Sequence, residues 1–429
     1  MVSPKGDQLS LANCMNTRRL WLSTDFGKLW LGQGISELGS SVSNLALPTL
    51  AVLSLHAGPF EVGLLAALQK VPFPFISLMA GVFVDRLPKR AVLIVCDLGR
   101  AAALGIIPLA AVFGHLDLWL LYGSATAKGV LSVFFDLAYL SYGPILVGRE
   151  DLSAANTRLD MNFAVANVAG PGLAGLLVQA IGAARTVALD AASFLVSAVS
   201  LVAIRHAEPP PERHPSRSVR VELAAGLRYV LGHVILRAQF TTMTLALFGA
   251  SFIDGILYPY AYRDLHLTPG ELGLALTIGG LAGFPGVWLG PRLARAIGIG
   301  PALVVGFLVI PVEMFVFPLA AILPTVPFLA GLFFVAALFN AGADLNQLTL
   351  RQTLTPDAFL GRMHSIYRTL VWGALPLGNF LGGVLGSTVG IDETLWIGGF
   401  IALLGCVAMW LSPVGRLRQV PLAATSAKD

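Results

Sequence analysis

Charge is scarce in this sequence. Lys, Arg, Asp and Glu make up 12% of its 429 residues, whereas 56% are hydrophobic and the mean hydropathy is +0.77. Soluble domains carry about 25% charged residues, so these values exclude an ordinary soluble protein. The pI is about 9.0, but the basic residues are scattered between apolar runs, which excludes the long basic stripe of a nucleic-acid-binding protein. The composition predicts an integral membrane protein.

Several chemical motifs are absent as well. Cys14, Cys96 and Cys406 show no CxxC spacing, so they predict neither a disulfide framework nor a metal site. The sequence has no GxxxxGKS or GxxxxGKT phosphate loop, which excludes an ATP-driven pump, and its histidines form no HExxH or paired-ligand spacing. It also lacks the filter-like repeat of a channel. We therefore expect no enzyme, no metal centre and no cofactor.

What the sequence has in quantity is long apolar runs. At about 20 apolar residues per crossing, it contains twelve candidate membrane spans with mostly short connections. Lipid cannot satisfy a bare backbone, so each span must be helical, and internal prolines such as Pro48, Pro72, Pro74 and Pro108 predict kinks. The predicted spans cover residues 28–55, 61–84, 91–114, 117–147, 159–181, 184–205, 237–262, 268–291, 298–322, 325–348, 363–388 and 393–412.

Lys and Arg are distributed unevenly about these spans. If the N-terminus is cytoplasmic, 23 of the 28 basic residues fall on the cytoplasmic side, two on the other side and three within spans. This asymmetry is a positive-inside signal. The sequence therefore predicts a multi-pass protein of the plasma (inner) membrane with both termini in the cytoplasm.

One long polar connection, residues 205–222, divides the chain. Its three consecutive prolines and its arginines predict an extended linker, followed by an interfacial helix over 219–232. A shift of 205 residues places Gly81 on Gly286, Arg90 on Arg295 and Pro171 on Pro376. The sequence thus predicts an all-α membrane fold of two pseudo-symmetric six-helix halves, which in transporters enclose a central site. The expected divisions are a tail over 1–27, a half over 28–205, a linker over 206–236, a half over 237–412 and a tail over 413–429.

Five stretches of the sequence carry a family resemblance. GVFVDRLPKR, residues 81–90, resembles the loop signature of the major facilitator superfamily. FFDLAYLSYGPILVGREDLSAANTRLD and NVAGPGLAGLL followed by ALDAASFLVSA resemble its drug-exporter and siderophore-exporter branch, which includes macrolide-efflux-like proteins. LRQTLTPDAFLGRMHSIYR resembles the matching loop of the second half. The resemblance covers about residues 20–412.

This resemblance implies the twelve-helix fold of the superfamily and secondary active transport by alternating access. It implies efflux of drug-like or secondary-metabolite molecules, with the proton gradient as energy source. The expected partners are a small amphipathic substrate and the lipid bilayer, with no nucleic acid, and the expected state is a monomer. A siderophore or metabolite exporter, or an importer of the same fold, is the alternative.

The acid and the bases of GVFVDRLPKR have different expected roles. A carboxylate at the end of one helix, such as Asp85, can accept hydrogen bonds from the N-terminal amides of another helix. By resemblance, Asp85, Arg86 and Arg90 form a cytoplasmic gate between the halves, and Gly81 allows close helix approach. An acid adds nothing to a positive-inside signal, so topology does not explain Asp85. At the shift of 205 residues Asp85 meets Gly290, which predicts one principal latch.

A second signature, GPGLAG at residues 170–175, lies in the fifth predicted span. Pro171 removes a backbone donor and kinks the helix, while Gly170 and Gly175 let a neighbouring helix pack closely. The segment resembles the antiporter signature associated with export, except that the usual earlier Gly is Ala166 here. A generic kinked helix interface is the alternative interpretation.

Ionisable residues inside membrane spans are costly and mark functional sites. Glu37 and Asp254 lie deep in their spans with no opposite charge close in sequence, where burial favours the protonated form and suits reversible protonation. By resemblance, the cavity is lined by the first, fourth, seventh and tenth helices. The candidates for proton or substrate binding on those helices are Glu37, Lys128, Asp136, Asp254 and Asp344.

Other interpretations apply to several charges within the spans. Asp97 and Arg100 lie three residues apart on one helix face, which predicts a structural ion pair. Asp136 and Asp344 lie toward cytoplasmic span ends, where solvation or the gate would also account for them. Lys128 has no acid four residues away, which leaves a cross-helix salt bridge and a substrate contact open. It also stands in a span where many drug antiporters carry a coupling Arg, a departure from the family pattern.

Overall fold

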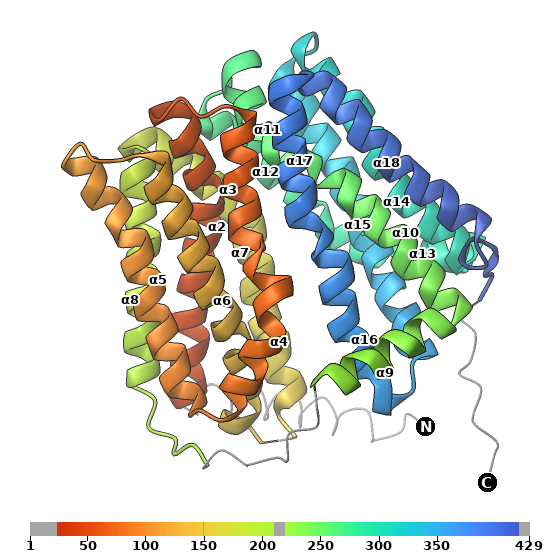
Figure 1. Cartoon of the computed structure of the whole chain (residues 1–429), viewed down its shortest axis with the longest axis horizontal. Helices are drawn as coiled ribbons and strands as arrows, with labels where there is room; N and C mark the ends of the chain where they lie inside the picture. Colours follow the sequence, from red (N-terminus) through yellow and green to blue (C-terminus); the bar gives the residue numbers. More distant parts are fainter. Residues whose placement is uncertain (1–23, 149, 210–218, 420–429) are drawn as a thin grey trace, which may run out of the picture. The chain divides into compact units, whose positions relative to one another are not determined.

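The computed structural model describes residues 24–148, 150–209 and 219–419, and these residues are helical with no strand (Figure 1). Most of the predicted N-terminal tail, the middle of the predicted linker and the end of the C-terminal tail lie outside these ranges, as does Cys14. The all-α fold class predicted from the sequence is confirmed.

The helices follow one another with short connections. The elements that cover the first six predicted spans are α2 (Thr24–Ser54), α3 (Pro59–Lys70), α4 (Pro72–Asp85), α5 (Lys89–Val112), α6 (Leu118–Leu146), α7 (Leu152–Ile181) and α8 (Ala183–Val202). The elements that follow the linker are α9 (Val219–Gly232), α10 (Val234–Ala250), α11 (Phe252–Pro259), η1 (Tyr260–Asp264), α12 (Pro269–Leu281), α13 (Gly283–Ile297), α14 (Ile299–Val316), η2 (Phe317–Ala321), α15 (Thr325–Leu354), α16 (Asp357–Tyr367), η3 (Arg368–Trp372), α17 (Ala374–Thr388), α18 (Ile391–Leu411) and η4 (Val414–Arg416).

Membrane-spanning length and composition recur along the described chain. Ten helical segments there are long and apolar enough to cross a membrane, and a pair bent by 60°, Pro59–Ser77 with Met79–Asp85, makes eleven if counted as one span. Helix α2 covers the first predicted span and has 31 residues, but it is not among them. Every predicted span therefore coincides with helical structure, and the number twelve requires both the bent pair and α2.

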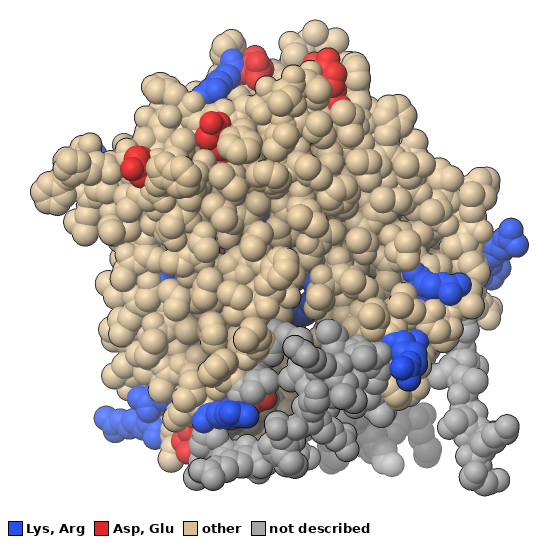
Figure 2. All heavy atoms as spheres, in the orientation of Figure 1, with Lys and Arg blue, Asp and Glu red and all other residues tan. Residues whose placement is uncertain are grey.

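The surface has the character expected next to lipid. On the face drawn in Figure 2, charged side chains lie mostly toward the upper and lower edges, with a broad charge-poor surface between them. Large apolar side chains such as Phe75, Val95 and Val199 are 74%, 64% and 69% exposed. Apolar exposure of this extent would be unfavourable in water and marks a membrane-facing surface.

Prolines and caps explain several helix boundaries. Helix α3 ends at Lys70 and α4 begins at Pro72, whose ring nitrogen has no N–H to donate to α3, while Val71 between them keeps helical dihedral angles. Pro48 and Pro108 lie instead within α2 and α5, which continue through them. The helix expected over 219–232 occurs as α9 with those bounds.

Residue contacts divide the chain into two compact units, which do not follow the order of the sequence. Helix α3 belongs by its contacts to the same unit as α11 and α17, although it precedes the linker. Unit 1 comprises Met1–Leu47, Ile76–Leu116 and Gly123–His214, and unit 2 comprises Pro48–Phe75, Asp117–Tyr122 and Pro215–Asp429.

In unit 1, α5 packs along α8 and the apolar core gathers around Leu93, Phe135 and Tyr142. Helix α2 also approaches α8 closely: a Cβ added at Gly39 would lie 2.8 Å from Ser193 Cβ, and one at Gly32 2.9 Å from Ser200 Cβ. Lipid tails are as apolar as the side chains, so such close packing between small residues stabilises helix association in membranes.

In unit 2, three helices meet almost backbone to backbone. A Cβ added at Gly63 of α3 would lie 2.6 Å from Asn379 O and 2.7 Å from Gly383 Cα of α17. One added at Gly255 of α11 would lie 2.8 Å from Asn379 O. Only glycine fits at these positions, so we call this contact of α3, α11 and α17 the glycine seam.

Candidate functional site

The interior of unit 1 holds an ion pair on α5. Arg100 Nη2 donates to Asp97 Oδ1, which confirms the pair predicted from their spacing. The Arg100 guanidinium also lies over the rings of Phe135 and Phe194, 3.9 and 4.3 Å from their centroids. Asp97 is fully buried and Arg100 is 5% exposed. Both charges are therefore compensated by an opposite charge or an aromatic face.

A second buried pair joins α6 to α8. Lys128 Nζ donates to Asp190 Oδ2 at 3.3 Å, and the two side chains are 10% and 0% exposed. Ser193 Oγ donates to Asp190 Oδ1 at 3.1 Å. The cross-helix salt bridge left open for Lys128 by the sequence is thus present. Its 3.3 Å separation exceeds the ~2.7–2.9 Å of a tight charge-assisted hydrogen bond.

Glu37 and Asp136 lie beside these two pairs and are both half-buried. The charges of Arg100, Lys128, Asp136 and Asp190 all act on Glu37. In the part of the chain that the structure describes, Glu37 has no hydrogen-bond or ion-pair partner. Carboxylates outnumber cations in this group, so binding of a proton or a cation would neutralise the excess negative charge.

Unit 2 contains a second cross-helix pair. Lys70 Nζ of α3 donates to Asp254 Oδ2 of α11 at 2.7 Å, and the side chains are 44% and 41% exposed. In the amide orientation that satisfies its hydrogen bonds, Asn379 of α17 donates to Asp254 Oδ2 at 3.2 Å and to Ser251 O at 2.9 Å. Asp254 has no opposite charge close to it in sequence, but the packing of α3 on α11 brings Lys70 to it.

A cavity of about 220 Å³ lies within unit 2, between α10, α11, α14 and α15. Its lining residues include two acids, Glu313 and Asp344, and the amide residue Asn340. Asp344 is exposed and Glu313 is half-buried. The sequence places these acids in separate spans, and only the packing of α14 against α15 shows that they share one cavity.

In the loop of GVFVDRLPKR, the side chains of Asp85 and Arg86 face solvent. Asp85 ends α4, and both side chains are exposed. Among the described residues, neither side chain has a hydrogen-bond or ion-pair partner. A Cβ added at Gly81 meets no atom within 4 Å. Among the residues that the structure describes, Asp85 therefore accepts none of the amide hydrogen bonds expected of it, and no close helix approach occurs at Gly81.

Glu208, in the connection after α8, lies at the start of α5. Its carboxylate accepts hydrogen bonds from the backbone N–H of Lys89 at 2.6 Å and of Arg90 at 3.2 Å. Those amides are unsatisfied within the helix and carry its positive dipole end. Glu208 rather than Asp85 therefore caps α5.

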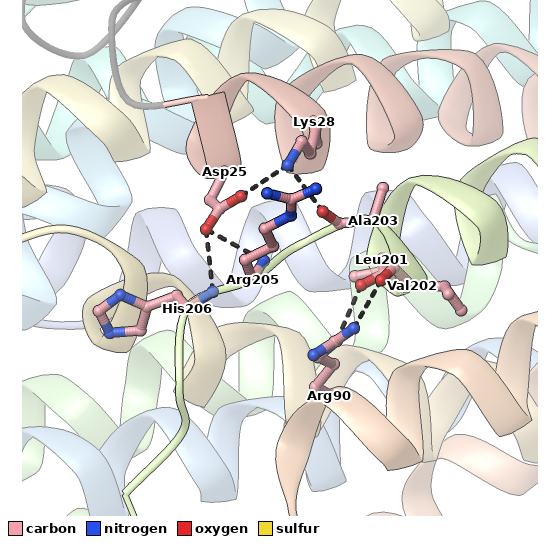
Figure 3. A network of polar contacts seen from close by, with 8 residues as sticks. All are labelled: Asp25, Lys28, Arg90, Leu201, Val202, Ala203, Arg205 and His206. Atoms are coloured by element: carbon pink, nitrogen blue, oxygen red, sulfur yellow. Dashed lines mark hydrogen bonds and ion pairs between the residues drawn. The ribbon is translucent and has the colours of Figure 1, made fainter.

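Arg90 binds the C-terminal end of a helix, whereas Glu208 binds an N-terminal end. Its Nε donates to Leu201 O at 2.9 Å and its Nη2 to Val202 O at 2.7 Å, as Figure 3 shows. These carbonyls lie at the C-terminus of α8, where a cation satisfies unpaired acceptors and the negative dipole end. Within unit 1, Arg90 thus holds the start of α5 to the end of α8.

The same end of α8 is bound by residues of α2 (Figure 3). Lys28 Nζ donates to Ala203 O at 2.7 Å and to Asp25 Oδ1 at 2.8 Å. Asp25 Oδ2 accepts from the backbone N–H of Arg205 at 3.1 Å and of His206 at 2.9 Å. The Lys28 ammonium and these two amides hold the pKa of the Asp25 carboxyl below its usual range.

The GPGLAG segment lies in α7, which continues through Pro171. A Cβ added at Gly170 would overlap the side chain of Ser41 on α2, so α7 approaches α2 closely there. Gly175 is buried. The close helix packing expected at Gly170 is therefore present.

The described ranges contain two cysteine thiols and no clustered set of metal ligands. No cluster of three or more His, Cys, Asp or Glu side chains there is arranged to hold a metal ion. Cys96 and Cys406 are buried free thiols.

Sequence reasoning gives no role to Asp190 or Glu208. Asp190 carries the signal that identifies the other candidates, since it is an acid inside a predicted span, so the same rule would have found it. Glu208 lies beside the prolines of the linker, and nothing in the sequence connects it with the start of α5. Its capping role depends on the path of the chain after α8, which brings Glu208 to the start of α5.

Comparison with known proteins agrees with this architecture. Many apolar helices with ionisable residues inside them describe a multi-pass membrane protein. The chain matches the transmembrane secretion effector family over residues 21–427. It therefore belongs to that family, within the major facilitator superfamily.

Two curated relatives resemble the chain along nearly its whole length. The multidrug efflux pump Tap of Mycolicibacterium fortuitum is 27% identical over 398 residues, which are 90% of this chain and 94% of the relative. The enterobactin exporter EntS of Citrobacter koseri is 26% identical over 410 residues, 92% of this chain and 94% of the relative. The membrane-transport class predicted from the sequence is confirmed by these similarities.

Solved transporter structures share the fold. A bacterial homologue of the iron transporter ferroportin, in an inward-facing state, matches with a TM-score of 0.68 at 18% identity, covering 90% of this chain and 97% of that chain. The nucleoside transporter NupG matches with a TM-score of 0.71 at 10% identity, covering 90% and 98%. At such identities the likeness concerns the fold alone.

Proposed function

We propose that this chain exports small amphipathic molecules, either drug-like compounds or secondary metabolites, in exchange for protons. The observation that supports proton coupling is that carboxylates outnumber cations around Glu37 in unit 1. Similarity to a multidrug efflux pump and to an enterobactin exporter supports the outward direction. The proposed moving parts are the sequence halves 28–205 and 237–412, joined by the linker over 206–236.

The coupling proposal assigns the proton to Glu37, with Asp136 as the neighbouring acid. When Glu37 is ionised, its charge attracts Lys128, which is held by Asp190 only at 3.3 Å. When Glu37 binds a proton, it loses its negative charge and no longer attracts Lys128, so Lys128 stays paired with Asp190. Proton binding thereby changes which acid holds the cation of α6. Asp254 and Asp344 are proposed to bind the substrate.

Two motifs are proposed to control the conformational cycle. Asp85 and Arg86 are exposed and lack described partners, so both are available to a contact in another state of the transporter. Arg90 and Gly81 complete this proposed cytoplasmic gate. Gly170, Pro171 and Gly175 are proposed as the antiporter-type helix contact, supported by the close approach of α7 to α2 at Gly170.

The proposed coupling is tested in proteoliposomes that hold ethidium and experience an imposed pH gradient. We expect the chain to move ethidium with the gradient, and nigericin to abolish that movement. Glu37→Gln should abolish gradient-driven movement while leaving ethidium exchange at equal pH. The matched control is Asp160→Asn, which neutralises an exposed acid of α7. Gradient-driven movement by Glu37→Gln at the level of that control would contradict the role of Glu37.

The proposed topology places both termini of the monomer in the cytoplasm, with the chain embedded in the inner membrane. A single cysteine at residue 212, in a background without Cys14, Cys96 and Cys406, tests this arrangement. We expect a membrane-impermeant maleimide to label it only after the membrane is opened. Labelling in intact cells would overturn the proposed orientation. Light scattering of the detergent-purified chain tests whether the chain is a monomer.

Siderophore export is the second candidate function. The similarity to the enterobactin exporter EntS covers 92% of this chain and favours it specifically. The two candidates differ in the charge of the cargo, because a catecholate siderophore is anionic and ethidium is a cation. Parallel transport assays with the two compounds decide between them.

A further inference from the structure

The cavity of unit 2 combines acidic and apolar lining residues. Glu313 stands on α14, and Asn340 and Asp344 stand one turn apart on α15. The remaining wall is apolar, with Leu247, Ala250, Ile253, Phe307, Ile310 and Met314. No Lys, Arg or His belongs to this wall among the described residues.

The two carboxylates of the cavity have no ion-pair partner in the described part of the chain. Arg351 acts on Asp344 through its charge, but its guanidinium lies 3.6 Å from the ring centroid of Tyr367 and outside the cavity wall. No charged residue acts on Glu313. This position differs from that of Asp190 or Asp254, each of which already holds a lysine.

Asn340 adds an independent sign of an unfilled site. Its Oδ1 is buried and has no hydrogen-bond partner. A buried polar atom without a partner is costly, and such atoms mark places where a ligand or water is bound. With Glu313 and Asp344, the wall therefore offers three acceptor groups, which equals the number of donors on a primary ammonium.

The size of the cavity limits the ligand. Its volume of about 220 Å³ exceeds the ~150 Å³ of an apolar protein cavity that admits benzene. A single ring with a short substituent is of that order. Phe307, Ile310 and Met314 are among the lining residues that supply apolar contact to the body of such a ligand.

We propose that this cavity binds a compact amphipathic cation, a protonated amine on a hydrocarbon body of about one ring. The ammonium lies at Glu313, Asp344 and Asn340 Oδ1, and the body contacts the apolar wall. This inference rests on the proposed export function and gives that function a substrate class. A neutral or anionic molecule of the same shape leaves the carboxylates unpaired and binds more weakly.

The test is equilibrium binding to the purified full chain in nanodiscs, without any gradient. The probes are benzylammonium, benzyl alcohol and benzoate, which share a ring and differ in charge, and titration calorimetry measures each. We expect benzylammonium to bind at least about tenfold more tightly than the other two, because loss of a charged hydrogen bond carries that order of effect. Equal affinity for the three probes would overturn the proposal.

Variants locate the binding. Glu313→Gln and Asp344→Asn keep the side-chain size, and each should weaken benzylammonium binding about tenfold or more. Ile310→Trp fills the cavity and should abolish binding, while Asp160→Asn should leave it unchanged. Thermal unfolding of each variant verifies that it is folded. Wild-type affinity in both acid variants, or in Ile310→Trp, would show that the cation binds elsewhere.

The experiments distinguish a failure of the proposed export function from a failure of the proposed cation-binding cavity. Because binding is measured without transport, loss of ethidium export with intact benzylammonium binding contradicts export alone. Intact ethidium export with no benzylammonium binding contradicts the cavity alone.

Discussion

The segments GVFVDRLPKR and GVWLGPRLAR, residues 81–90 and 286–295, correspond under a shift of 205 residues but differ in local structure. In the first, α4 ends at Asp85 and α5 begins at Lys89, and Gly81 has free space around it. In the second, α13 continues to Ile297. There a Cβ added at Gly290 would lie 2.7 Å from the carbonyl carbon of Gly342 on α15.

This difference separates two uses of the same residue types. In GVWLGPRLAR, glycine is required for helix packing inside unit 2, and Asn346 Nδ2 reinforces the contact by donating to Gly290 O at 3.0 Å. In GVFVDRLPKR, Gly81 has no packing role in this structure, and the exposed acid Asp85 has no counterpart in the second segment. Packing explains the second segment, and a gate contact is what we propose for the first.

The largest expected effect is on the stability of Gly290→Ala. The added methyl group overlaps the backbone of α15, and overpacking of this kind costs about 1–3 kcal/mol. Gly81→Ala is the matched control, because its methyl group meets open space and Ala favours the helix by up to about 1 kcal/mol. Thermal unfolding in detergent measures both. Equal losses of stability in the two variants would remove the contrast between the segments.

A second prediction concerns Asp85→Asn. The side chain is exposed and has no described partner, so the unfolding temperature should not change. Loss of a gate contact of about 1.4 kcal/mol would lower ethidium transport about tenfold. Transport in proteoliposomes, at matched protein content, is the measurement. Wild-type transport by Asp85→Asn would exclude Asp85 from the gate, and Asp160→Asn controls for loss of an exposed acid.

Arg90 and Arg295 extend the comparison to the basic residues. Arg90→Met removes two hydrogen bonds to the end of α8 and should lower the free energy of unfolding by about 1 kcal/mol. Arg295 is exposed and donates only to Pro291 O of its own helix, at 3.3 Å, so Arg295→Met should have almost no effect. Urea unfolding of both variants checks this. A smaller loss for Arg90→Met than for Arg295→Met would contradict the capping role.

The smallest expected effect is the pH dependence of Asp25. Its pKa is lowered in the folded chain by Lys28 and by the amides of Arg205 and His206. The ionised carboxylate therefore adds stability above its unfolded pKa, and this stability is lost as the pH falls through the lower folded pKa. Asp25→Asn should lack that acid-dependent part of the loss. Unfolding temperatures between neutral and acidic pH, with Asp160→Asn as control, measure the difference.

Local features were predictable from the sequence because they depend on neighbouring residues. Each span must satisfy its own backbone in lipid, so apolar runs predicted the helices, and α9 has the predicted bounds. The spacing of Asp97 and Arg100 likewise predicted their pair. Lys70 and Asp254, by contrast, are 184 residues apart, and their contact depends on how α3 packs against α11. The shared cavity of Glu313 and Asp344 has the same origin.

The glycine seam has a consequence for biosynthesis. Its first member, Gly63 of α3, leaves the ribosome early, whereas Asn379 and Gly383 of α17 are among the last membrane residues to be made. During most of translation α3 therefore waits in the membrane without the partner that only glycine allows it to approach so closely. Chains that stop before α17 leave this face of α3 without its α17 partner, and unpaired packing surface of this kind makes incomplete chains prone to misassembly.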